Sequence, residues 1–424
     1  MKLKNQMKGL YLTKAILIPM CALILVAALT GCGAKGGSGQ PAAALDASAE
    51  ITFWHTYGDA ENDVFTNEVL PLWSTAYPNI KVNPVRQDSG QFHQMVVTSF
   101  GTGQSPDVAR IDIVNTAPYA KQGGLLALSD LEGFSTSQYL DGPLSTNFYQ
   151  GKYYGLPLDT NCKAAVINTF VLKDELGIDN TDFTMEEFII AAGKRGQYSL
   201  NVSGVGDWDM YPYFWLFGGV LTDENFTTAT GYLNGEQSVA AIEKLQELHD
   251  KKVFTIRDID GSIDAWDGIN SDYAMFFEGP WFFGAYEEKE SAGIIAKTIP
   301  TYNGKSASVV GGENIVVFTT STQQAAAYEF AKFMTSEEVQ LAMLKSGQLP
   351  ILKSLVNHSD ITSDPVWSVY MQQLSTGASA RIPSPNHSEI GQVWSDTMNN
   401  IFVDGKDVKT ALSEAAAQID SLLK

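Results

Sequence analysis

The stretch that decides the fold is residues 51–114, "ITFWHTYGDAENDVFTNEVLPLWSTAYPNIKVNPVRQDSGQFHQMVVTSFGTGQSPDVARIDIV". Short apolar runs that favour β-strands alternate in it with segments whose apolar residues recur at helical spacing. The expected strands cover residues 51–57, 80–85 and 107–114, and the expected helices cover residues 62–76 and 91–103. Because this order requires crossover connections, it predicts an α/β fold with parallel strands and helices packed on the sheet faces.

The carboxyl ends of the expected strands are the first candidate site, because ligands of open parallel sheets lie beyond these ends. Polar and aromatic side chains occupy them, namely His55, Thr56, Tyr57, Arg86, Gln87, Asp112 and Asn115.

Further helices are expected over residues 185–196, 238–253, 322–335 and 408–423, the first with Thr184 and Glu187 at capping-box spacing. A chain of 424 residues exceeds one ordinary domain core, so two domains are expected.

The N-terminus has the features of an export signal. A lysine-rich start precedes an apolar run over residues 15–29, which is too short for a bilayer span of roughly 20 residues. The run ends in "LTGC", which resembles the bacterial lipobox and implies lipidation of Cys32, removal of residues 1–31 and attachment to the outer side of the cell membrane. The alternative is a plain signal peptide with an incidental cysteine. Residues 32–50 are rich in Gly, Ala and Ser, which is typical of a flexible tether.

Charge and cysteine content exclude several classes of protein. The formal net charge of −20 argues against nucleic acid and against anionic lipid or polyanion partners. Of the three cysteines, Cys21 leaves with the signal and Cys32 is the expected lipid site. Only Cys162 remains, so no intramolecular disulfide is expected. A nucleophilic role for Cys162 is weighed against a buried, inert thiol, and the buried thiol is preferred.

Catalytic, cofactor and metal motifs are scarce. The sequence has no Gly-x-Ser-x-Gly, His-Glu-x-x-His or P-loop pattern, and its histidines show no metal-ligand spacing. Residues 258–264, "DIDGSID", faintly resemble a calcium loop, but Gly261 and Ile269 do not fit the EF-hand positions, so a solvated turn is expected. Paired carboxylates for glycoside hydrolysis remain open in so acidic a chain.

Two clusters combine aromatic and acidic residues, "GDWDMYPYFWLFGG" at 206–219 and "AMFFEGPWFFGAY" at 274–286. Sugars expose apolar C–H faces and a rim of hydroxyls, so a sugar site combines flat rings with polar side chains. In the second cluster the strand pattern puts Met275 and Phe277 on one face and Phe276 on the other. Pro280 suits the first turn of a helix, which places Trp281 at a strand-to-helix corner. Phe276, Phe277, Phe282 and Phe283 are predicted to be core.

An ordered series of motifs covers nearly all of the chain after the tether: 51–63, 77–82, 103–112, 119–128, 153–161, 166–168, 273–286, 309–318, 330–340, 347–354 and 381–394. Together with the lipobox, it resembles the extracellular solute-binding lipoproteins of bacterial sugar ABC importers, the family that includes maltose-binding protein. The resemblance implies a two-lobed periplasmic-binding-protein fold of class II with about three interdomain crossovers and a ligand cleft between the lobes. It implies lobe 1 at 51–158 plus 308–352, and lobe 2 at 159–307 plus 353–424.

The implied function is binding of a neutral sugar or oligosaccharide and its delivery to the membrane permease. The protein would be a monomer without enzymatic activity, cofactor or metal. Two alternatives stay open. One is a secreted, lipid-anchored glycoside hydrolase that uses carboxylates such as Glu278 and Asp209. The other is a polyol or glycerophosphodiester carrier of the same fold.

Gln87 is a candidate ligand-binding residue because it lies at the end of an expected strand. The resemblance to the family implies the other candidate ligand-binding residues. These are Thr56, Tyr57, Asp59, Asp112, Asn115, Asp159 or Asn161, Trp208, Asp209, Trp281, the segment with Gly312 and Glu313, and Arg381. Trp281 is implied to be a stacking ring. Relatives carry an amide at the position of Glu278, which leaves the role of this carboxylate open.

Overall fold

The computed structural model describes residues 48–424. The predicted signal segment, Cys32 and all but the last residues of the tether lie outside these residues. The described residues belong to one compact unit that contains two large β-sheets and a two-stranded hairpin. The hairpin consists of β4 (Phe148–Tyr149) and β5 (Lys152–Tyr153). The predicted boundaries of the two lobes stay a prediction.

The first sheet contains the parallel strands that the sequence predicts. Strand β1 pairs in parallel with β2 on one side and with β3 on the other. The sheet has the order β13-β12-β3-β1-β2, and β6 also pairs with β12. Its strands are β1 (Ala49–His55), β2 (Ile80–Arg86), β3 (Val108–Asp112), β6 (Gly155–Cys162), β12 (Ser308–Val317) and β13 (Ala378–Ser379).

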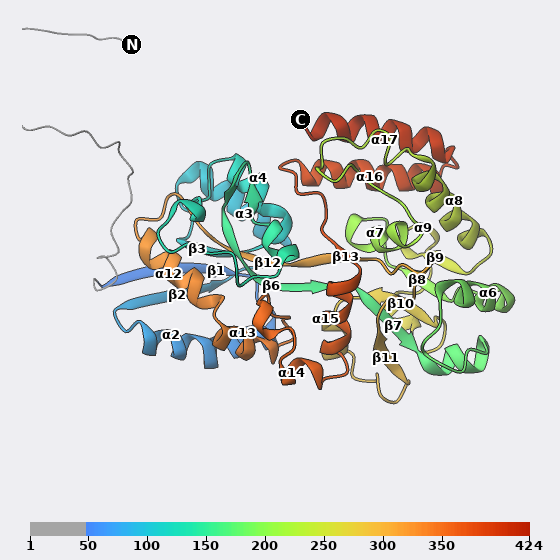
Figure 1. Ribbon diagram of the computed structural model, residues 1–424, viewed down its shortest axis with the longest axis horizontal. Helices are drawn as coiled ribbons and strands as arrows, with labels where there is room; N and C mark the ends of the chain where they lie inside the picture. Colours follow the sequence, from blue (N-terminus) through green and yellow to red (C-terminus); the bar gives the residue numbers. More distant parts are fainter. Residues whose placement is uncertain (1–47) are drawn as a thin grey trace, which may run out of the picture. The chain divides into compact units, whose positions relative to one another are not determined.

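Helices cover both faces of this sheet (Figure 1). One face packs on α2 (Leu70–Ala76), α12 (Gln324–Met334) and α13 (Glu337–Leu344), and the other on α3 (Ser89–Thr102) and α4 (Thr116–Lys121). The alternation of β1 explains the arrangement, because Phe53 packs against Phe330 of α12 whereas Trp54 packs with the cluster around α3.

The second sheet has the order β11-β7-β10-β8-β9. Its strands are β7 (Ala164–Asn168), β8 (Leu200–Val202), β9 (Phe254–Ile256), β10 (Met275–Glu278) and β11 (Ile294–Lys297). One face packs on α6 (Met185–Arg195), α7 (Asp207–Leu216) and α8 (Glu236–Asp250), and α16 (His387–Phe402) and α17 (Val408–Leu422) join the same core by packing on α7 and α8. The other packs on α10 (Ala265–Gly268), α11 (Trp281–Ala285) and α15 (Trp367–Thr376).

The remaining helical segments are short: α1 (Asp59–Val64), a π-helical turn (Phe65–Val69), α5 (Asp141–Ser145), α9 (Arg257–Asp260), α14 (Ser359–Thr362), a second π-helical turn (Val171–Glu175), and 3₁₀ turns at Ile113–Asn115, Leu128–Asp130 and Lys353–Leu355. The chain runs between the two sheets from β6 to β7, from β11 to β12, and from β13 to α16, which packs on α7 through Trp394. Figure 1 shows β6 and β12 running along the middle of the molecule toward the second sheet.

The local predictions can be compared with the structure directly. Thr184 caps α6 and shares a capping box with Glu187, as predicted. The stretch 274–286 forms β10, a turn and α11. Met275 and Phe277 belong to the core on one face of the second sheet, and Phe276 belongs to the core on the other. Phe282 and Phe283 are also buried, so the core assignment is confirmed for all four phenylalanines.

Candidate ligand-binding site

The site is built around Arg110, a buried arginine inside the apolar strand β3. Its Nη2 lies 3.3 Å from Glu61 Oε1, 3.5 Å from Asp159 Oδ2 and 3.0 Å from Glu313 Oε2. Its Nη1 donates a hydrogen bond to Thr56 Oγ1 at 2.9 Å. One guanidinium therefore holds three carboxylates, which we call the Arg110 cluster.

The strands explain why these carboxylates meet. Glu313 of β12 is paired with Asp112 of β3 on one side and with Asp159 of β6 on the other. The pairing with β6 shifts after Glu313, so that Leu158 forms a bulge, a feature that often re-aims side chains next to functional sites. The carbonyl oxygen of Leu158 accepts a hydrogen bond from Gln340 Nε2 at 2.7 Å, which satisfies the backbone group at the bulge.

Glu61 reaches the cluster from α1. Its Oε2 accepts a hydrogen bond from the backbone amide of Gly58 at 2.7 Å, and its Oε1 accepts one from Gln348 Nε2 at 2.9 Å. The Tyr57 ring packs beneath the guanidinium, with the Arg110 carbon 4.9 Å from the ring centroid. Glu61 is therefore well satisfied, whereas Asp159 Oδ2 is buried and has no hydrogen-bond partner.

The electrostatics of the cluster follow from burial. Burial raises the pKa of Asp159 and of Glu313 against the opposing effect of Arg110, and the shift of Glu313 is the larger. Burial alone would lower the pKa of Arg110, but Glu313, Asp159 and Glu61 raise it above its ordinary value, so the guanidinium stays charged. Burial, with Arg110 and Arg86, lowers the pKa of nearby His55 to about 4, so this imidazole is neutral.

A cavity of about 790 Å³ opens beside the Arg110 cluster. We call it the Trp281 cavity. Its walls come from strands of the first sheet and from helices and turns beside both sheets: residues 56, 58–61, 89, 110, 159–161, 280, 281, 284, 285, 313, 345–348 and 367. Trp281 is 42% exposed, although it stands next to the buried Phe282. The cavity thus offers an open indole face beside buried charged groups.

A second indole supports the first. Trp208, at the start of α7, stacks on Trp281 with ring centroids 5.9 Å apart. The ammonium of Lys163 and the guanidinium of Arg381 lie 5.4 Å and 5.5 Å from the Trp208 ring centroid. Lys163 also pairs with Asp209 at 2.5 Å. Trp208 and its cations therefore form a rigid backing for Trp281.

Six of the predicted ligand-binding residues line the Trp281 cavity: Thr56, Asp59, Asp159, Asn161, Trp281 and Glu313. Trp208 and Asp209 stand directly behind Trp281 and Lys163. The structure therefore brings together residues from five separate segments of the chain. Their contact with a ligand stays a prediction.

The other predicted residues lie elsewhere. Tyr57 is almost fully buried in the core beneath Arg110, because its ring packs on Phe53 and Phe65. Gln87 lines a shallower recess at the ends of β1 and β2. Gly312 has a φ of +118°, and a Cβ there would lie 2.5 Å from the carbonyl oxygen of Asp159, so the position requires glycine.

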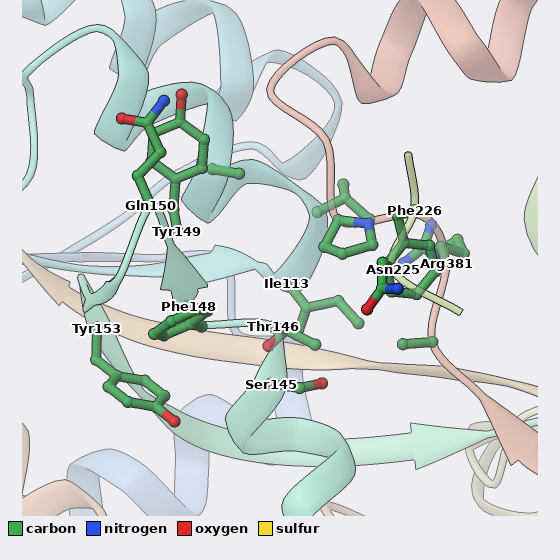
Figure 2. Close-up of a pocket in the computed structure, with 14 residues that line it drawn as sticks. Ile113, Ser145, Thr146, Phe148, Tyr149, Gln150, Tyr153, Asn225, Phe226 and Arg381 are labelled. Atoms are coloured by element: carbon green, nitrogen blue, oxygen red, sulfur yellow. The ribbon is translucent and has the colours of Figure 1, made fainter. Parts of the chain in front are cut away.

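The remaining three predicted residues belong to one region next to Trp208. Asp112 caps the 3₁₀ turn after β3, Asn115 is the last residue of this turn, and Arg381 lies 3.5 Å from Asp112. Arg381 lines a second cavity, of about 460 Å³, together with Ile113, Thr146 and Phe226. Figure 2 shows Phe148, Tyr149, Gln150 and Tyr153 on one side of this cavity and Asn225, Phe226 and Arg381 on the other.

The two cavities lie on opposite faces of β12. Glu313 lines the Trp281 cavity, whereas the side chain of the next residue, Asn314, bonds to Thr146, which lines the second cavity. Asn314 is fully buried and also bonds to Thr116 and Asn147. Alternate side-chain directions along a strand explain this separation.

Sequence reasoning missed Arg110, Glu61, Gln348 and Trp367, which line the Trp281 cavity. Arg110 carried a usable signal, since the single basic residue in the strand-like run "DVARIDIV" has to find partners if the strand is buried. Cys162 is a buried free thiol whose pKa is raised by burial, as expected of an inert cysteine. The stretch 258–264 is only partly a turn, because residues 258–260 belong to α9 and Gly261 ends this helix; Asp260 accepts hydrogen bonds from Thr255 and Ser262.

Comparisons with known proteins agree with this architecture. The diacetylchitobiose binding protein DasA of Streptomyces coelicolor is 25% identical over 348 residues, covering 78% of this chain and 80% of DasA. The maltotriose-binding protein of Pyrococcus abyssi is 22% identical over 396 residues, covering 87% of this chain and 80% of that protein. The solved GacH receptor of Streptomyces glaucescens superposes with a TM-score of 0.76 at 22% identity, covering 89% and 98% of the two chains.

The fold is thus the two-lobed α/β fold of solved ABC-transporter binding proteins. Within residues 48–424, no helix is both long and apolar enough to cross a membrane. A family model for bacterial extracellular solute-binding proteins matches residues 74–367. Because this match spans well over half of the sequence, the chain belongs to the bacterial extracellular solute-binding protein family.

Proposed function

We propose that this protein is the substrate-binding lipoprotein of a carbohydrate ABC importer. It binds a sugar or oligosaccharide in the Trp281 cavity, closes around it by hinge motion and delivers it to the membrane permease. A lipid on Cys32 anchors the mature monomer on the outer side of the cell membrane. The family membership and the lipobox support this assignment.

The single observation that carries the proposal is the exposed Trp281 ring beside the Arg110 cluster. The indole face suits the apolar C–H face of a pyranose ring, and the carboxylate and amide oxygens suit its hydroxyl rim. The names of the similar proteins point the same way, since DasA binds diacetylchitobiose and the Pyrococcus abyssi protein binds maltotriose. The GacH receptor was solved with acarbose and an acarbose homolog.

The positions of the candidate catalytic carboxylates favour binding without turnover. Glu278 accepts hydrogen bonds from Trp266 Nε1 at 3.1 Å and from the Gly279 amide at 2.8 Å, and Asp209 is paired with Lys163. Neither is among the residues that line the Trp281 cavity. In this arrangement Glu278 fixes the turn that carries Trp281, which gives it a positioning role.

The acidity of the Arg110 cluster also disfavours a glycerophosphodiester ligand. A phosphodiester would have to approach Asp159 and Glu313, and its negative charge would be repelled at short range. A neutral polyol remains compatible with the same hydrogen-bonding groups, and it is an outcome of the ligand screen below.

A thermal-shift screen of sugars, oligosaccharides and polyols tests the proposal, followed by calorimetry and product analysis on each hit. Ligand at 100 times Kd stabilises a protein by roughly 2.7 kcal/mol, which is readily measured. Stoichiometric binding without product is expected. Release of shorter sugars would support a hydrolase, and the absence of any carbohydrate hit would contradict the proposed function.

A further inference from the structure

The Arg110 cluster holds more negative than positive charge at the floor of the Trp281 cavity. Arg110 Nη2 is shared by Glu61, Asp159 and Glu313. The other cations nearby are already engaged, since Arg86 pairs with Asp59 at 2.8 Å and Lys345 pairs with Glu68 at 2.6 Å. The floor of the cavity is therefore short of positive charge.

Three buried polar atoms of the cavity wall have no hydrogen-bond partner: Arg110 Nε is a donor, and Asp159 Oδ2 and Asn161 Oδ1 are acceptors. Asp159 is 3% exposed, and its Oδ2 lacks a hydrogen-bond partner although it lines the cavity. Asn161 Oδ1, in the same wall, is also buried and unpartnered. Buried acceptors without donors are costly, so this site suits a ligand that supplies N–H or O–H groups there.

We infer that the ligand carries a protonated amine, and that the Trp281 cavity selects an amino sugar or amino-sugar oligosaccharide over the same skeleton bearing a hydroxyl or an N-acetyl group. This inference rests on the proposed function and specifies its ligand: the sugar is cationic, whereas the sequence led us to expect a neutral one. The ammonium group donates to Asp159 Oδ2 and Glu313, while the sugar ring stacks on Trp281. Hydrogen bonds between ionised partners are roughly twice as strong as neutral ones.

The proton inventory of the free protein supports the inference. Glu313 lies beside the carboxylates of Asp159 and Glu61, and Arg110 is the cation that faces it. Burial is the main cause of the raised pKa of Glu313, and this shift favours its protonated form in the free protein. A protonated amine supplies that positive charge instead, and its binding releases the proton from Glu313.

The test is isothermal calorimetry at neutral pH with matched sets of sugars. Each set holds one skeleton in three forms: glucosamine, glucose and N-acetylglucosamine; galactosamine, galactose and N-acetylgalactosamine; chitobiose, cellobiose and N,N′-diacetylchitobiose. In at least one set the amine form is expected to bind about tenfold more tightly than the other two. Titrations in two buffers of different ionisation enthalpy are expected to report proton release for the amine form only.

Three variants test the assigned atoms. Asp159→Asn and Glu313→Gln keep the shape of the side chain and remove its charge. Each variant is therefore expected to reduce the preference for the amine form. Glu313→Gln is also expected to abolish the proton release. Asp141→Asn is the control, because Asp141 is an exposed carboxylate that pairs with Lys353 and stands apart from the cavity. The Asp141→Asn variant is expected to prefer the amine form as strongly as the wild-type protein does.

The outcomes separate the two proposals. If hydroxyl or N-acetyl forms bind as tightly as the amine, or if only sugars outside these sets bind, the inference is overturned and the proposed function stands. If no carbohydrate binds at all, both are overturned. An amine preference that survives in both Asp159→Asn and Glu313→Gln would also overturn the assignment of the ammonium to these carboxylates.

Discussion

Trp208 and Trp281 stack face to face, with ring centroids 5.9 Å apart and planes inclined by 28°, although they belong to α7 and α11. Trp208 lies next to the cations of Lys163 and Arg381, and Trp281 faces the cavity, so the pair presents a single supported aromatic surface. Within the aromatic stretch 274–286, we therefore expect ligand binding to depend on Trp281 and stability to depend on the buried rings.

Trp281→Ala is expected to weaken sugar binding by roughly 2 kcal/mol or more, as for a central interface aromatic. Its effect on the free energy of unfolding should stay well below the roughly 3–5 kcal/mol of a buried aromatic, because the ring is half-exposed. Phe277→Ala is the matched comparison, since Phe277 is buried against Tyr213, and it should lose stability rather than affinity. Urea unfolding and ligand titration of both variants give the answer; a Trp281 variant that unfolds easily yet binds normally would contradict the stacking role.

Gly311→Ala is expected to disturb the support of this surface. A Cβ at Gly311 would overlap Asn161 Oδ1 and lie 2.7 Å from the Trp208 ring, so both side chains would have to move. Overpacking of this kind costs about 1–3 kcal/mol, and binding should weaken as Trp208 shifts. Gly391→Ala in α16 serves as the control, because a Cβ there meets no atom within 4 Å. Equal affinities of the two variants would show that Trp208 is not held through Gly311.

The Arg110 cluster is expected to make stability fall as pH rises. Burial raises the pKa of Glu313 well above 4.5, so the folded chain keeps a proton that the unfolded chain releases above that pH. The stabilisation is complete below the unfolded pKa and is lost as pH rises through the folded pKa. Glu313→Gln should flatten this decline.

Urea unfolding of both chains from pH 4 to pH 8 measures the difference directly. His55 acts in the opposite direction, because its pKa is lowered from 6.5 to about 4 and protonation favours the unfolded chain in that interval. Since His55 is present in both chains, its contribution cancels in the difference curve, which reports Glu313 together with its neighbour Asp159. A difference that is constant with pH would refute the raised pKa.

Sugar phosphates and sulfates are expected not to bind, because an added anion would face Asp159 and Glu313. Calorimetry with each bound sugar and its phosphate, at matched ionic strength, tests the expectation. Tighter binding of the phosphate would count against both the acidic site and the ligand class.

Cys32→Ser is expected to release the protein from the membrane fraction or to leave it unprocessed, since the "LTGC" motif places the lipid on this cysteine. Stable anchoring takes more than one acyl chain. Mass spectrometry of the mature N-terminus checks the modification, with the buried Cys162→Ser variant as the matched control. An unlipidated N-terminus in the wild-type protein would refute the anchor.

The sequence predicted what depends on local pattern. The alternation in "YAMFF" assigned Met275, Phe276 and Phe277 to the correct faces, and the position of Pro280 predicted the corner at which Trp281 is exposed. It could not predict the partners of Arg110, because Glu61, Asp159 and Glu313 come from segments up to some two hundred and fifty residues apart. Nor could it predict that Tyr57 is buried, which depends on packing against Phe53 and Phe65, or that Leu158 forms a bulge beside Asp159, which depends on pairing with β12.

The opposite directions of Glu313 and Asn314 constrain how relatives of this protein can diverge. A deletion or insertion of one residue in β12 would exchange the two faces, sending the carboxylate toward Thr146 and the amide into the Trp281 cavity. Change within this strand is therefore limited to substitution. Insertions and deletions can accumulate only in the loops that rim the cavities. New ligand preferences should therefore arise in these loops by changes of length, and in β12 by changes of residue type.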